Sequence, residues 1–252
     1  MAIPIIIPLG AGSFKGNWEL RFLLRSIDRH LKGAGEVCLV TQYCPGFINR
    51  NAVKVLNVPD LYHDNKDANL WRKTLAAIRA LDAGKFIFCA DDNCFMQDIQ
   101  ADQIPVLHNP RGREHFVLKP HTAWRERMRN TLEWAERQGF RLECNYDCHA
   151  PQLFDGGRIL AGMDRAEAEF VTRPGLCIYT VWRVLEGVPA SLPQASFKTG
   201  FNGECAETLQ AMSDADLCAR PLLGYNDGFV VGGGLERLQR LFPEPCKYEV
   251  TA

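Results

Sequence analysis

The sequence predicts an α/β domain with a mostly parallel sheet, because apolar segments of strand length alternate with segments of helical periodicity through the first hundred residues. The clearest strand is residues 85–90, where five of six residues are apolar, as in a strand buried on both faces of a parallel sheet. A chain of 252 residues is long enough for one such domain with long excursions. We therefore expect residues 1–252 to form a single domain.

The first expected strand is the apolar segment 3–9. Its prolines at positions 4 and 8 predict a strand that lies near the sheet edge or has irregular ends. Residues 10–13 follow as a flexible turn whose backbone amides could receive a phosphate. The turn lacks the G-x-G-x-x-G and Walker patterns, so a plain connection from strand to helix is the favoured interpretation.

An amphipathic helix and two further strands come next. Residues 37–41 and 53–58 are apolar enough to form the second and third strands, and the first of these completes a β-α-β unit. Glycine at position 33 marks the end of the helix. The helix is indicated by apolar residues at helical spacing, namely Leu20, Leu23, Leu24, Ile27 and Leu31.

The segment 64–82 is predicted to form the next helix and carries two stripes. Trp71, Leu75 and Ile78 form an apolar stripe that should pack on the sheet. The second stripe is polar, and it is either a solvated basic face or a set of side chains that reach a nucleotide or diphosphate at the adjacent strand end. Its members are Lys66, Asn69 and Lys73, with Arg72 beside them.

The strand at 85–90 ends abruptly in Asp91, Asp92 and Asn93. Adjacent like charges repel and are costly to dehydrate, so the two acids suggest a site that holds a cation. Ligands of open α/β sheets gather at the carboxyl ends of strands, which is where these acids fall. The alternative is a solvated turn, in which Asp and Asn are ordinary residues.

A second polar cluster contains Asp147 and His149. Side chains two residues apart on extended chain point the same way, so both could share one site. His149 could then bind the metal that Asp91 or Asp92 touches, and Asp147 could be the general base for an acceptor hydroxyl. The alternative is that Asp147 caps a turn and His149 is satisfied in the core. Asp227 is a second candidate for the base.

The later elements are less strongly marked. Residues 122–138 are predicted to be helical, and the local excess of Lys and Arg over 111–141 could face a polyanion. Interleaved glutamates favour a salt-bridged surface helix instead. The remaining expectations are a helix or strand at 179–185, a short helix at 206–212, a polar loop at 224–228 and a helix at 235–241.

The order β-α-β-β-α-β followed by an acid cluster resembles the nucleotide-sugar half of GT-A glycosyltransferases, whose metal-binding DxD element lies at this place. Here the element is Asp91-Asp92-Asn93, with Asn93 in place of the last acid. The chain is similar to a small group of phage and bacterial glycosyltransferase-like proteins in three further motifs. These are K-D-x-N-x-x-x-K at residues 66–73, Y-D-x-H-x-P at 146–151 and F-P-E-P-C-K-Y-E at 242–249.

The resemblance implies a Rossmann-like domain with a mixed, mostly parallel sheet that transfers a sugar from a nucleotide diphosphate sugar, with a UDP-sugar as the favoured donor, to an acceptor hydroxyl. Residues 1–100 would bind the donor, and residues 101–252 the acceptor, either a glycan or a hydroxymethylated base in phage DNA. Mn²⁺ or Mg²⁺ would be held by Asp91, Asp92, Asn93 and His149. The expected donor contacts are Pro8, Gly10, Lys66, Asn69, Arg72, Lys73, Asp91 and Asp92.

Two other functions are consistent with the same residues. A nucleotidyltransferase acting on a sugar phosphate also needs a metal on its nucleotide, but it should carry a glycine-rich basic signature after the first strand. Residues 9–16 supply only a loose version of that signature. A non-catalytic nucleotide- or carbohydrate-binding protein would bind its ligand tightly without turnover.

Composition and short sequence patterns indicate which partners, thiol state and cellular location to expect. The net charge of -1 gives no global argument for nucleic acid or membrane as a partner. The sequence shows neither a signal peptide nor a run long enough to cross a membrane. Its ten cysteines are scattered and include no C-x-x-C pair, so we expect reduced thiols rather than disulfides or a structural zinc. These features favour the cytoplasm, or the host cytoplasm for a phage protein.

Overall fold

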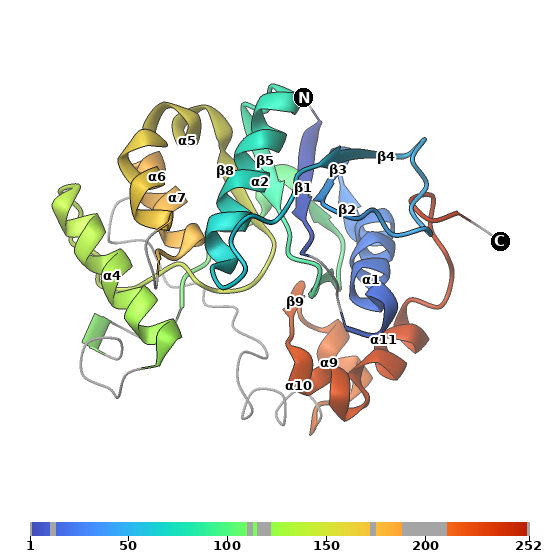
Figure 1. Cartoon of the computed structure of the whole chain (residues 1–252). Coiled ribbons are helices and arrows are strands. Elements are labelled where there is room, and N and C mark those ends of the chain that lie inside the picture. Colours follow the sequence, from blue (N-terminus) through green and yellow to red (C-terminus); the bar gives the residue numbers. More distant parts are fainter. Residues whose placement is uncertain are drawn as a thin grey trace.

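The centre of the protein is a five-stranded sheet, described by a computed structural model (Figure 1). The model describes residues 2–10, 14–109, 113–114, 122–171, 175–187 and 211–250. Four strands are parallel, and the last is antiparallel to its neighbour. The predicted α/β class with a mixed, mostly parallel sheet is confirmed. In spatial order the strands are β4 (Val53–Asn57), β3 (Ala34–Thr41), β1 (Ile3–Pro8), β5 (Lys85–Phe88) and β8 (Gln152–Asp155).

Strand β1 lies in the middle of the sheet, so of the two predicted alternatives, a position near the edge or irregular ends, the second is found. It pairs with β3 on one side and β5 on the other. Its three isoleucines at positions 5–7 are completely buried, and burial on both faces decides the central position. The prolines are accommodated as irregular ends: the register with β3 shifts between Ile3 and Ile5, and Pro8 is the last residue.

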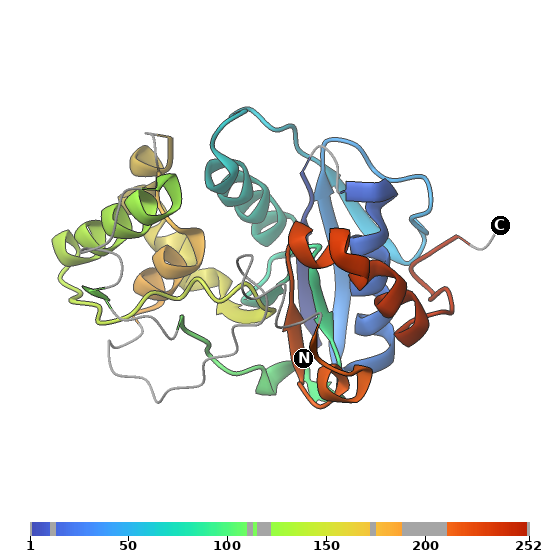
Figure 2. The ribbon, with the colours of Figure 1, turned by 90° about the horizontal axis from the view of Figure 1, so that it is seen from below.

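Helices α1 (Phe14–His30) and α2 (Lys66–Leu81) cover opposite faces of the sheet (Figure 2). Ile5 and Ile7 pack with the apolar residues of α1, whereas Ile6 packs with those of α2. This alternation follows from the two-residue period of a strand. The predicted apolar stripe of α2 is confirmed, since Trp71, Leu75 and Ile78 all belong to the buried core.

Four further helices lie on the α2 side of the sheet (Figures 1 and 2). The segment 179–185, predicted as helix or strand, lies within helix α7 (Ile178–Glu186), and every residue of this helix is buried. Its Trp182 lies with ring centroids 5.9, 5.0 and 4.9 Å from Phe86, Phe88 and Phe154. The helix predicted over 122–138 is also confirmed. The four are α4 (Ala123–Arg137), α5 (Gly156–Gly162), α6 (Asp164–Val171) and α7 (Ile178–Glu186).

The C-terminal residues form a small unit beside α1 (Figure 1). Its strand β9 (Leu222–Gly224) pairs antiparallel with β6 (Asn93–Phe95). The segment expected as a loop at 224–228 therefore ends a strand and begins α10 (Asp227–Phe229). The helix predicted at 235–241 is confirmed, and most of the one at 206–212 lies outside the described residues. The other elements here are α9 (Asp214–Cys218), η2 (Val230–Gly234) and α11 (Leu235–Leu241).

Short elements complete the fold. Strand β2 (Leu31–Lys32) pairs in parallel with β7 (Ile99–Gln100), which precedes η1 (Ala101–Gln103). The nine cysteines among the described residues are all free. None of the described helices combines the length and apolar character that crossing a bilayer requires.

A buried ion pair attaches the last described residues to α1. Both carboxylate oxygens of Glu249 lie 2.6 Å from a guanidinium nitrogen, one of Arg21 and one of Arg25. Arg25 also donates to the carbonyl oxygens of Phe242 and Pro243. Burial alone would raise the pKa of Glu249, but the hydrogen bonds from Arg25 and Arg21 hold it below its ordinary value. The 242–249 motif therefore anchors the chain end.

Candidate active site

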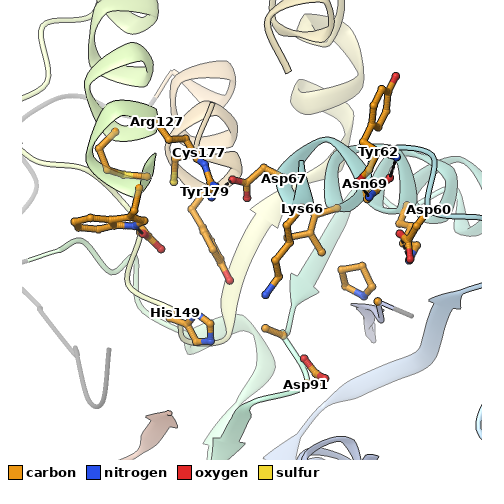
Figure 3. Close-up of a pocket in the computed structure, with 18 of the residues that line it drawn as sticks. Asp60, Tyr62, Lys66, Asp67, Asn69, Asp91, Arg127, His149, Cys177 and Tyr179 are labelled. Carbon is orange, nitrogen blue, oxygen red and sulfur yellow. Dashed lines mark hydrogen bonds and ion pairs between the residues drawn. The ribbon is translucent and has the colours of Figure 1, made fainter. Parts of the chain in front are cut away.

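The carboxyl ends of β1 and β5 open into a pocket of about 530 Å³ (Figure 3). The chain builds β1, β3 and β4 toward one edge of the sheet and then returns to place β5 on the other side of β1. Crevices at such a reversal of strand order are where open α/β sheets bind ligands. Eight residues predicted from the sequence line this pocket: Pro8, Gly10, Lys66, Asn69, Lys73, Asp91, Asp147 and His149.

The acid pair follows the end of β5 after Cys89 and Ala90, and of the two acids Asp91 lines the pocket whereas Asp92 lies outside its lining. Burial and the neighbouring Asp92 raise the pKa of Asp91 to about 6, although Lys66 and His149 oppose the shift. Asp92 Oδ2 lies 2.5 Å from His149 Nε2. Its other oxygen, Oδ1, is buried and has no hydrogen-bond partner among the residues that the structure describes. An unsatisfied buried acceptor is costly, so this oxygen fits a cation or donor that a ligand brings.

Asn93, predicted as a metal ligand, points its amide at backbone groups. Its Oδ1 accepts a hydrogen bond from Ala90 N at 3.0 Å, and its Nδ2 donates to His149 O at 3.2 Å. The residue is completely buried. The acid pair and the His149 segment are thus connected through the side chain of Asn93.

The polar stripe of α2 divides into two kinds of residue. Lys66 is exposed, and its ammonium points into the pocket between His149 and Asp91 (Figure 3). No hydrogen bond or ion pair of this ammonium occurs within the described part of the chain. Arg72 donates to Pro59 O and does not line the pocket. Lys66 is therefore the cation of this stripe that a ligand can reach.

Asn69 and Lys73 are buried and bind the protein itself. Asn69 Oδ1 accepts from the backbone N of residues 61 and 62, and its Nδ2 donates to Tyr62 O at 2.7 Å. Lys73 Nζ lies 2.6 Å from both Leu9 O and Asp60 Oδ1. These two residues fix the loop before α2 and the end of β1. They shape the pocket wall.

Asp147 lies on the side of the pocket formed by the second half of the chain. Its Oδ2 accepts a hydrogen bond from Trp124 Nε1 at 2.8 Å. Its backbone N donates to Asn145 Oδ1, and its carbonyl accepts from Asn109 Nδ2. The carboxylate is thereby held in one orientation at the edge of the pocket. The chain is not extended at His149, where φ is +46°, yet both residues line the pocket as predicted.

An ion pair across the pocket, between Asp67 of α2 and Arg127 of α4, was not anticipated. Arg127 Nη1 lies 2.6 Å from Asp67 Oδ2, and Figure 3 shows both at the rim beside Cys177. Burial raises the pKa of Asp67 to about 6 although Arg127 opposes the shift. The expected partners of the α4 arginines were glutamates on the same helix, because sequence spacing shows only neighbours along one helix.

Glu19 of α1 is a further acid that the sequence reasoning missed. It is 4% exposed, and burial followed by Asp91, Asp92 and Asp227 raises its pKa to about 8. Asp227 itself is exposed and lies outside the pocket lining. The signal was present, since Glu19 precedes Leu23 by four residues and so shares the apolar face of the helix.

The residues present fit a divalent cation shared with a ligand. Among the described residues, no group of three or more His, Cys, Asp or Glu side chains could hold a metal by itself. Mg²⁺ in proteins is often held by one or two carboxylates together with substrate phosphates. Asp91 and the unpartnered Oδ1 of Asp92 meet that requirement.

Comparison with known proteins adds no assignment. No protein-family model matches the sequence, and no curated protein matches it either. The function is therefore argued from the pocket.

Proposed function

We propose that the protein is a metal-dependent glycosyltransferase that moves a sugar from a nucleotide diphosphate sugar, with a UDP-sugar as the favoured donor, to an acceptor hydroxyl. The observation that carries the proposal is the acid pair at the reversal of strand order. Asp91 lines the pocket, and the adjacent Asp92 keeps its Oδ1 buried without a hydrogen-bond partner among the described residues. Neither a structural turn nor a closed ion pair accounts for that oxygen.

The donor half would bind the diphosphate between Asp91, Asp92 and Lys66. A bound Mn²⁺ or Mg²⁺ would supply positive charge that stabilises the leaving diphosphate. Lys66 adds a second positive charge at the first residue of α2, where the helix dipole also favours an anion. A pair of opposite unit charges at about 4 Å is worth on the order of 4 kcal/mol near a protein surface.

Asp147 is the favoured base of the two candidates. It lines the pocket, whereas Asp227 does not, and the hydrogen bond from Trp124 orients its carboxylate. A positioned carboxylate that takes the proton of the acceptor hydroxyl contributes roughly a hundredfold or more to the rate. A glycan and a hydroxymethylated base in DNA both present such a hydroxyl, so either acceptor belongs to the proposal.

The proposal is tested by product release. Wild-type protein with UDP-glucose and Mn²⁺ should release UDP, slowly to water and faster with an acceptor hydroxyl. The same protein with UTP and a sugar phosphate should release no pyrophosphate, which is the product expected of a nucleotidyltransferase. Tight UDP binding without any release would indicate a binding protein instead.

The matched variants are Asp92→Asn in the site and Asp102→Asn on the surface. Asp92→Asn removes the charge with little change in shape and should lower UDP release by at least a hundredfold, while the circular dichroism spectrum stays that of the wild type. Asp102 is exposed, so Asp102→Asn should release UDP at the wild-type rate. Wild-type release by Asp92→Asn would end the proposal.

A further inference from the structure

Three segments that are far apart in the sequence meet behind the acid pair. Asn93 of β6 pairs with Gly224 of β9, and Tyr225 N donates to Asp92 O at 3.1 Å. The third segment ends at His149, whose carbonyl accepts the hydrogen bond from Asn93. The position of each segment therefore depends on the other two.

His149 has a backbone conformation that its surroundings must maintain. Its φ of +46° is in the left-handed region, which costs a residue other than glycine about 1–2 kcal/mol. The Asn93 amide spans from Ala90 N to His149 O and so connects the end of β5 to this backbone. Because Asn93 is completely buried, water cannot replace either hydrogen bond.

Gly224 allows the close approach of β9 to the same carbonyl. A Cβ atom at position 224 would lie 1.9 Å from His149 O, a distance at which the backbone must move. Glycine here is explained by this contact, because Gly224 pairs in β9 and has no positive φ. Asn93 thus binds the His149 carbonyl, and Gly224 leaves the room that this carbonyl occupies.

The consequence is a fixed imidazole against one oxygen of Asp92. His149 Nε2 lies 2.5 Å from Asp92 Oδ2, while Oδ1 has no partner among the described residues. A carboxylate that is held through one oxygen in a close ion-pair contact presents its other oxygen in a defined direction. Partners of this kind orient metal ligands, and their loss typically lowers metal affinity 10- to 100-fold.

We infer that Asn93 and Gly224 are positioning residues that keep His149 on Asp92 Oδ2, so that, of these described residues, Asp91 and Asp92 Oδ1 are the ones offered to a cation. His149 and Asn93 then orient the site and are not ligands. The inference rests on the proposed function for the identity of the ligand, but the positioning itself can be measured without metal.

The first test uses metal-free protein. The chain has six histidines, so ¹⁵N spectra of the imidazoles are simple, and the His149 signals are identified by their absence in His149→Gln. Asn93→Ala should shift the His149 Nε2 signal, because the tie to the backbone is lost. A purely ligating Asn93 would leave that signal unchanged without metal, and an unchanged signal would overturn the inference.

The matched control is Asn49→Ala. Asn49 Nδ2 also donates to a distant backbone carbonyl, that of Lys247, so this variant loses a similar tie elsewhere and should leave the His149 signals in place. Gly224→Ala should shift them as Asn93→Ala does. If Gly224→Ala does not fold, the His149 signals of Asn93→Ala still test the inference.

The second test measures Mn²⁺ affinity by electron paramagnetic resonance in the presence of UDP. Asn93→Asp restores an acid at the third position but removes the donor to His149 O, so we expect Mn²⁺ to bind at least tenfold more weakly than in the wild type. Equal or tighter binding would make residue 93 a ligand and contradict the inference. A wild-type protein that binds no Mn²⁺ would contradict the proposed function, while the imidazole spectra would still test the positioning.

Discussion

Helix α1 contributes to two clusters of buried carboxylates that differ in how their charge is compensated. Glu249 has two guanidinium groups at 2.6 Å, and its pKa lies below the ordinary value. Glu19 lies near Asp91, Asp92 and Asp227, and the pKa of Glu19 is raised to about 8 by burial and by those acids. The first cluster is closed by the protein's own cations. The second gathers acids whose ionised forms burial and mutual repulsion disfavour, and a bound cation would favour those forms.

The largest expected change in stability comes from removing Arg25 from the ion pair with Glu249. Arg25→Met leaves Glu249, which is 3% exposed, with Arg21 as its one remaining guanidinium partner among the described residues and removes the more deeply buried half of the ion pair. Breaking such a pair costs about 3–5 kcal/mol, so the urea midpoint should fall sharply at pH 7. A midpoint within error of the wild type would show that the two clusters do not differ in the way described.

A substitution in the cluster around Glu19 is expected to change stability in the opposite direction. Asp91→Asn removes a buried like charge and should stabilise the metal-free protein by on the order of 1–2 kcal/mol above pH 7. The same substitution should abolish the rise in melting temperature that Mn²⁺ with UDP gives the wild type. Asp102→Asn should change neither quantity. Destabilisation of the metal-free protein by Asp91→Asn would break the comparison.

The two clusters also predict that stability falls at opposite ends of the pH range, at alkaline pH for Glu19 and at acid pH for Glu249. The raised pKa of Glu19 means that its contribution is fully present below about 4.5 and is lost as the pH rises through about 8. The lowered pKa of Glu249 means that its contribution is present above 4.5 and is lost as the pH falls further. Glu19→Gln should therefore flatten the alkaline limb, and Arg25→Met the acid limb, in melting curves of metal-free protein.

The charges that face Glu19 include one cation, Lys66, besides the three acids. If the Glu19→Gln variant loses as much stability at alkaline pH as the wild type, another group must cause that loss. Asp91, with a pKa of about 6, would then be the group to replace next.

A smaller effect separates two cations of the α2 motif. Lys66→Met removes the ammonium that points into the pocket and should weaken UDP binding about tenfold, the value of one charge-assisted hydrogen bond. Arg72→Met removes a group outside the pocket lining and should leave UDP affinity unchanged, with a stability change within about 0.5 kcal/mol. Calorimetric titration with UDP checks both, and equal losses would contradict the division of the stripe.

Sequence periodicity predicted the strands and the long helices because each buries a face of fixed period. It left the position of β1 open between the edge and the interior of the sheet, since proline statistics describe single residues and not the burial of Ile5 to Ile7 on two faces. The pocket residues Asp91, Asp147 and His149 were predicted because the acids follow an expected strand and Asp147 and His149 are two residues apart. Glu19 could have been found from its spacing to Leu23, whereas Gly224 and the Asp67–Arg127 pair depend on contacts between distant segments, which spacing along the chain does not encode.

The central claim is that Asp91 and Asp92 gather a divalent cation beneath the diphosphate of a nucleotide sugar. Calorimetric titration of UDP with and without Mn²⁺ tests it most directly, in the wild type and in Asp92→Asn. We predict that Mn²⁺ tightens UDP binding at least tenfold in the wild type and not at all in Asp92→Asn. The same UDP affinity with and without Mn²⁺ in the wild type, or a full gain retained by Asp92→Asn, would contradict the claim.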